Sequence, residues 1–125
     1  MADDDELKPI EVESTKDVSL SLHIGGSFPY KWQLYEYPAA GGEPLPQGGE
    51  LAGTAPVSIG QVGKGVVRRF AWSVAVVSDD DAEQTVEITG HVQIASKTVG
   101  TVKGKLAVAR PLKKCFVNVH VKGKA

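Results

Sequence analysis

The chain has 125 residues, 42% hydrophobic and 23% charged, which suffices for one domain whose core needs no disulfide or metal support. Its one cysteine, Cys115, excludes an intramolecular disulfide, and its apolar runs are too short to cross a bilayer. The net charge of −1 hides a split: residues 1–87 carry six bases and fifteen acids (−9), whereas residues 88–125 carry eight bases and no acid (+8).

The chain begins Met-Ala-Asp-Asp-Asp-Glu, the reverse of the basic start of a signal peptide. We expect residues 1–7 to form a disordered acidic N-terminus and residues 8–125 to form a single domain. Without a signal or a disulfide, the sequence favours a cytoplasmic protein. A virion protein, or export without a signal, stays open as an alternative.

Alternation of apolar and polar residues with period two dominates the chain, and no segment shows a helical i, i+3, i+4 pattern. Weaker strand signals lie at residues 8–13 and 51–62, and a Pro/Gly-rich loop covers residues 38–50. The strong alternating segments are residues 18–24, 28–34, 70–76, 86–94, 102–108 and 115–121. Seven or eight strands in a chain of this length predict an all-β antiparallel sandwich, with a barrel as the alternative.

Short turns join the strands between residues 64 and 121, at residues 79–82, 96–98 and 110–113. Loops of this length are typical of hairpins, so we predict a C-terminal four-stranded antiparallel meander. Around Thr98 we predict a register in which Gly90 faces Leu106 and Val92 faces Gly104. In strand count and in its expected core tryptophan, Trp32, the chain resembles an immunoglobulin-like sandwich in general appearance. That resemblance implies no function.

The densest aromatic segment runs from Phe28 to Tyr37. Strand parity places Trp32 in the core and directs four side chains outward, namely Lys31, Gln33, Tyr35 and Tyr37. Aromatic side chains at a surface bind sugars, peptides and bases. We therefore predict a small binding patch here beside loop 38–50. The alternative is that the two tyrosines pack against their own loop.

The C-terminal strands direct polar and basic residues outward, and the candidate ligand residues among them are His91, Lys103, Lys105, Asn118 and His120. In the predicted meander, Lys105 lies beside His91 and Lys103 beside His120, which forms one basic face able to bind an anionic ligand. The same lysines disfavour a zinc site at the histidines. Nucleic-acid binding is disfavoured because the pI is near 6.3. Edge-strand protection by lysines, or neutralisation by the acidic half, would also explain this face.

Motifs of catalysis are missing from the sequence: it has no Gly-x-Ser-x-Gly elbow, and Gly60–Gly65 lacks the phosphate-loop spacing. Residues 79–81 fit an acidic turn better than a calcium loop. Arg68 breaks the apolar parity of its strand, so it either precedes the strand proper or lies at the mouth of the core with a carboxylate partner. Cys115 shares the parity of Val117 and should be buried and inert. We expect no catalytic residue, metal ligand or cofactor.

The leading hypothesis is a non-catalytic protein interaction module that self-associates, since oppositely charged halves can dock onto one another. A homo-oligomer or another protein is the expected partner. A lectin-like binder of glycans or small polar ligands is the first alternative. A metal-dependent enzyme that uses the outward histidines is the second.

Overall fold

The computed structural model describes residues 8–26, 28–38, 41–46 and 56–124, which form strands and connecting segments without a helix. No membrane-spanning helix is therefore present in these ranges. The predicted acidic N-terminus, residues 1–7, lies outside them. The strands of the described residues are β1 (Ile10–Val12), β2 (Val18–Ile24), β3 (Tyr30–Tyr37), β4 (Leu45–Pro46), β5 (Val57–Gly60), β6 (Val67–Val77), β7 (Gln84–Ile94), β8 (Lys97–Val108) and β9 (Leu112–Gly123).

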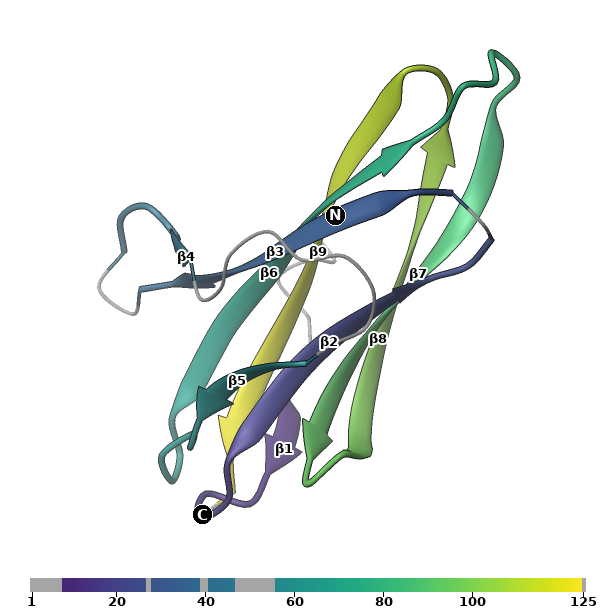
Figure 1. Cartoon of the computed structure of the whole chain (residues 1–125). Coiled ribbons are helices and arrows are strands. Elements are labelled where there is room, and N and C mark those ends of the chain that lie inside the picture. Colours follow the sequence, from purple (N-terminus) through teal and green to yellow (C-terminus); the bar gives the residue numbers. More distant parts are fainter. Residues whose placement is uncertain (1–7, 27, 39–40, 47–55, 125) are drawn as a thin grey trace.

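The strands form a sandwich of two open sheets (Figure 1). The five-stranded sheet has the order β1-β9-β6-β3-β4, and the four-stranded sheet has the order β5-β2-β7-β8. The predicted all-β sandwich is thus confirmed, and the barrel alternative is wrong. The two weak strand signals correspond to β1 and β5, although residues 51–55 lie outside the described ranges. The two-residue β4 lies within loop 38–50, of which residues 39–40 and 47–50 are also outside.

The predicted C-terminal meander is wrong, because of the four strands β6 to β9 only β7 and β8 form a hairpin within one sheet. The chain crosses from one sheet to the other after β6 and again after β8, and β6 pairs with β9. The spacing between packed sheets is about 10 Å, which three extended residues can span. A short loop therefore does not distinguish a hairpin from a crossing between sheets.

The predicted register of the β7–β8 hairpin is wrong by four residues. Gly90 faces Val102 and Val92 faces Gly100, because the turn lies at Ala95 and Ser96 rather than around Thr98. Both turn residues have positive φ, 52° and 68°, which suits a two-residue hairpin but is uncommon outside glycine and asparagine. An even shift leaves the inward and outward faces of each strand unchanged.

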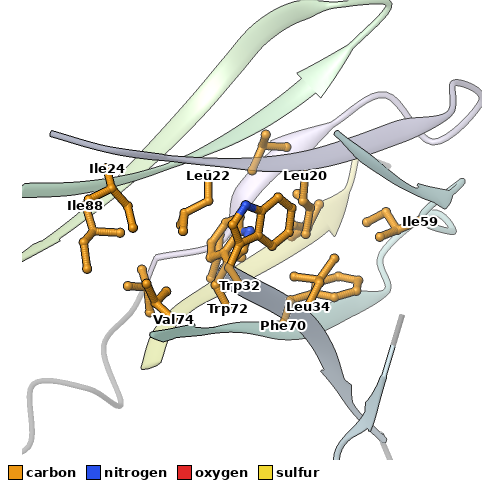
Figure 2. Packing of buried hydrophobic residues seen from close by; sticks show 14 of the residues in the cluster. Leu20, Leu22, Ile24, Trp32, Leu34, Ile59, Phe70, Trp72, Val74 and Ile88 are labelled. Atoms are coloured by element: carbon orange, nitrogen blue, oxygen red, sulfur yellow. The ribbon is translucent and has the colours of Figure 1, made fainter. Parts of the chain in front are cut away.

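The core lies between the two sheets and centres on two tryptophans (Figure 2). Trp32 on β3 and Trp72 on β6 are 1% and 0% exposed, which confirms the predicted core position of Trp32. Aliphatic residues of β2, β6 and β7 surround them. Gly90 on β7 accommodates the Trp72 ring, because a Cβ atom at this position would lie 2.6 Å from two ring carbons.

Arg68 lies at the mouth of this core with a carboxylate partner, as one of the two sequence alternatives stated. Its guanidinium donates two hydrogen bonds to Glu36, of 2.6 and 2.7 Å, and a third of 2.8 Å to the carbonyl of Ile59. Glu36 belongs to the five-stranded sheet and Ile59 to the other, so Arg68 ties the two sheets together. The hydrogen bonds to Glu36 raise the pKa of Arg68, against the opposing effect of partial burial.

Cys115 has the expected inward parity but is only half-buried. Burial raises the pKa of its thiol. The protonated thiol is a poor nucleophile.

Candidate functional site

The outward face of β6 carries small side chains in the middle of the five-stranded sheet. Ala71, Ser73 and Ala75 alternate with the large inward residues of the same strand. The neighbouring strands β3 and β9 place larger residues on both sides of this row. A shallow trough therefore follows β6 for about 14 Å, from Ala71 to Ala75.

Aromatic side chains form the walls of one half of the trough. Register sets Tyr35 beside Ala71, and it sets Gln33 and Phe116 on the two sides of Ser73. Tyr35 donates a hydrogen bond of 2.8 Å from its hydroxyl to Oε1 of Gln33, which orients both side chains. Phe116 is 64% exposed. An open hollow of about 340 Å³ over Ala71 and Ser73 is bordered by Tyr35, Tyr37, Glu43, Pro44 and Phe116.

Basic side chains flank the other half of the trough. Lys31 of β3 and Lys114 of β9 lie on the two sides of Ala75, in the same row across the sheet. Two strand spacings separate their backbones, roughly 9–10 Å. A second hollow of about 130 Å³ lies between them and shares Ser73 with the first. An anionic group over Ala75 would thus meet a lysine on each side.

Tyr37, Arg69 and His120 form the row across the sheet beyond Ala71. Partial burial, and then the nearby positive charge of Arg69, lower the pKa of His120 below its ordinary value. Asn118 stands between His120 and Phe116 along β9, beside Ala71. Polar and aromatic groups therefore continue this face of the sheet beyond the end of the trough.

The structure brings together six of the nine candidate ligand residues on this one face: Lys31, Gln33, Tyr35, Tyr37, Asn118 and His120. Tyr35 and Tyr37 were predicted to form a patch with Lys31 and Gln33, and the sheet adds Asn118 and His120 to it. Asn118 and His120 belong to the same face because β9 pairs with β6, and β6 in turn pairs with β3.

The remaining three, His91, Lys103 and Lys105, lie on the outward face of the other sheet. The predicted single basic face is therefore wrong, for the same reason as the meander. His91 lies beside Ser21 and Thr101, Lys103 beside Thr89, and Lys105 beside Glu87.

Acids and bases interleave around the described surface, although the sequence separates them. Glu87 opposes Lys105 on β7 and β8, and Glu11 opposes Lys122 on β1 and β9. Arg110 makes an ion pair of 3.3 Å with Asp81. Strand pairing thus places residues of the acidic part next to residues of the basic part.

Sequence reasoning missed Phe116 as a trough wall, and it missed the small residues of β6 as the floor. The floor had a signal, since residues 70–75 read Phe-Ala-Trp-Ser-Val-Ala, an alternation in size as well as in parity. Among the described residues no group of three His, Cys, Asp or Glu side chains is placed to hold a metal ion. Arg68 is engaged by Glu36 and Ile59 rather than directed into the trough.

No protein-family model matches this chain, and no curated protein matches it either. One similar solved structure is a domain of unknown function, DUF4425, from Bacteroides vulgatus ATCC 8482, with 18% identity, a TM-score of 0.48, and coverage of 86% of this chain and 95% of that chain. Another is a DUF4425 family protein from Bacteroides ovatus ATCC 8483, with 14% identity, a TM-score of 0.47, and coverage of 84% and 94%. A functional assignment for this chain therefore rests on the geometry of its own residues.

Proposed function

We propose that this protein is a non-catalytic, lectin-like recognition module that binds an acidic glycan along the trough of the five-stranded sheet. One observation carries the proposal: a floor of small residues lies between aromatic walls at one half and two lysines at the other. Sugar rings have apolar C–H faces that stack on aromatic rings, and hydroxyls that pair with amides and alcohols. A uronate or sulfate group pairs with lysine.

Each part of the trough has a role in this proposal. Tyr35 and Phe116 stack on a sugar ring over Ser73, and the hydroxyl of Ser73 and the amide of Gln33 pair with ring hydroxyls. Lys31 and Lys114 hold the acidic group of the next ring over Ala75. The length of the floor, about 14 Å, suits a short extended chain rather than one compact molecule.

The groups that line the two hollows support a binding role rather than a catalytic one. Among the described lining residues, Glu43 is the one carboxylate and Ser73 the one aliphatic hydroxyl, and no histidine accompanies them. A paired acid and base, or a nucleophile with its base, is what hydrolysis of a glycan requires. A metal-dependent enzyme gains no support, because His91 and His120 lie in different sheets.

The test is a glycan array that includes neutral, uronate-containing and sulfated oligosaccharides, followed by titration with the strongest ligand. Tyr35→Ala is expected to weaken binding by about tenfold or more, since stacking on one aromatic is worth about 1–3 kcal/mol. Ser73→Trp, which fills the floor, should abolish binding. Failure of all glycans to bind, or binding that neither variant alters, would overturn the proposal.

The charge requirement has a matched control. The double variant Lys31→Ser with Lys114→Ser should lose the preference for acidic over neutral glycans. The double variant Lys103→Ser with Lys105→Ser makes the same charge change on the other sheet and should bind as the unaltered protein does. Equal losses in both would indicate general electrostatic attraction rather than a site.

Self-association is the second candidate function. In the sequence, self-association was predicted from an acidic N-terminal part and a basic C-terminal part. Strand pairing, however, places acids of the first part beside bases of the second. The observation that favours it is a different one: among the described residues, no strand pairs with most of the outer edge of β9.

A further inference from the structure

Strand β9 is paired along its whole length on one side and over a quarter of it on the other. On its inner side, β6 pairs with it from Leu112 to Lys122. On its outer side, β1 pairs only with the last three residues, Val121 to Gly123. No strand of the described residues pairs with the outer side of residues 112–120. Within the described residues, these nine positions therefore form an open sheet edge.

Two hydrogen bonds show which backbone groups this edge presents. The amide of Gly123 donates to the carbonyl of Val66 (3.0 Å), and the amide of Ser78 donates to the carbonyl of Pro111 (3.1 Å). Odd-numbered residues of β9 therefore direct their N–H and C=O groups toward β6, and the register stays constant between these two ends. Because successive residues alternate, the even-numbered residues direct theirs outward. Those residues are Leu112, Lys114, Phe116, Asn118 and His120.

The open edge of β9 carries one outward lysine, Lys114 near its start, and is less protected than the edge strand of the other sheet. Strand β8 carries Lys103 and Lys105 on its outward face, side by side near its centre. Lysines in that position discourage pairing with another chain. The centre of the open edge of β9 carries Phe116 instead, an aromatic residue that is 64% exposed.

We propose that the occupant of this edge is a second copy of the chain, paired antiparallel through β9 about a two-fold axis at Phe116. This register uses the whole open edge, because Phe116 is its midpoint. Leu112 then faces His120 of the partner, Lys114 faces Asn118 of the partner, and Phe116 faces its own counterpart. Lys114, Phe116 and Asn118 form hydrogen-bonded pairs with two bonds each, about six bonds in total, and the N–H of His120 can add one bond to Leu112 at each end, because β1 already pairs with the carbonyl side of His120.

Charge and side-chain chemistry favour this register. No lysine opposes a lysine across the axis, whereas an axis at Lys114 would set two ammonium groups face to face. The Phe116 rings meet on the outward face, where aromatic cross-strand pairs add to stability. The two five-stranded sheets become one continuous sheet, and the two troughs lie on the same face on either side of the axis.

Sedimentation of the full chain tests the proposal. The dimer is expected to be weak and concentration-dependent, because an edge contact of this length is small beside a standard interface. Asn118→Pro removes an outward N–H in each copy while leaving the bonds to β6 intact, since proline is tolerated where the N–H faces away from the sheet. It should weaken dimerisation by about tenfold or more. Asn118→Ala, which keeps the N–H, is the matched control and should dimerise normally.

Cysteine cross-linking tests the register independently. In a Cys115→Ala background, Phe116→Cys places two thiols across the axis with Cα atoms about 5.5 Å apart, within the range of a disulfide. Mild oxidation should give a covalent dimer. Lys114→Cys is the control, because its two Cα atoms would lie about 14 Å apart. That variant should stay uncrosslinked.

Other outcomes would overturn the inference. A chain that sediments as a monomer up to millimolar concentration has no such dimer, and binding of an acidic extended peptide by that monomer would assign the edge to a peptide. The dimer would use another surface if Asn118→Pro left it unchanged and the Lys114→Cys variant formed a disulfide as readily as the Phe116→Cys variant. The inference is independent of the glycan, so either proposal can fail alone.

Discussion

Substitution of Gly90 by alanine should destabilise the fold, because the Trp72 ring packs directly on the backbone of β7. A Cβ atom at this position would lie 2.6 Å from Cη2 and Cζ3 of Trp72 and 3.0 Å from Cγ2 of Val102. Ordinary carbon contacts are about 3.5–4.0 Å. The ring would have to move by about 1 Å inside a core in which it is 0% exposed. Overpacking of this kind costs about 1–3 kcal/mol.

Gly104→Ala on β8 is the matched control, since a Cβ there would lie 3.5 Å from Cγ2 of Val117, an ordinary contact. Both substitutions reduce the backbone freedom of the unfolded chain by the same amount, which stabilises the fold by about 0.4–1 kcal/mol. The difference between the two variants therefore isolates the clash, and we expect it to be about 1–3 kcal/mol. Urea unfolding followed by tryptophan fluorescence gives this difference from the midpoints. If both variants unfold at the same urea concentration, the packing of Trp72 on Gly90 is refuted.

Two further predictions concern groups outside the core. Arg68→Ala should cost about 2–3 kcal/mol in urea unfolding, because it leaves the part-buried carboxylate of Glu36 without its partner; Arg69→Ala, on the exposed face, should stay within about 0.5 kcal/mol of the unaltered protein. The depressed pKa of His120 means that the unfolded chain binds the proton more tightly, so this residue contributes stability above pH about 6.5 that is lost as pH falls. In the register Arg69 faces His120, and Glu11 faces Lys122, the next outward residue of β9. In urea unfolding, His120→Gln should lose less stability between pH 7 and 5 than the control His23→Gln. An equal loss in both variants would mean that another group causes the decline.

Much of the sandwich could be predicted because alternation of period two fixes which residues are buried, and this alternation survives errors of register. Trp32 and Trp72 are in the core, and Arg68 breaks the pattern at the point where a carboxylate meets it. Strand order could not be predicted. The connection from β8 to β9 is short whether it turns back along the sheet or crosses to the other one, and the residues buried by β9 are the same in both cases.

The part of the candidate site on β3 was predicted and the part on β9 was not, because the strand order was unknown. Parity alone directed Tyr35 and Tyr37 outward, but their neighbours depend on strand order. Pairing of β9 with β6 places Phe116 and Lys114 at the trough. Pairing of β8 with β7 places Lys103 and Lys105 on the other sheet. The turn at Ala95 and Ser96 was missed because neither residue is of the type that usually adopts positive φ.

Phe116 connects the two proposals, since the same exposed ring forms a wall of the trough and the midpoint of the open edge. Single exposed apolar residues are ordinary on protein surfaces. The position of this one, beside a hollow and on an unprotected edge, is what requires an explanation. Its neighbours separate the two roles. Tyr35 lines the trough and lies two strands from the edge, whereas Asn118 presents its backbone to the edge. If Tyr35→Ala weakens glycan binding without changing sedimentation, and Asn118→Pro weakens dimerisation where Asn118→Ala does not, Phe116 serves two surfaces that act independently.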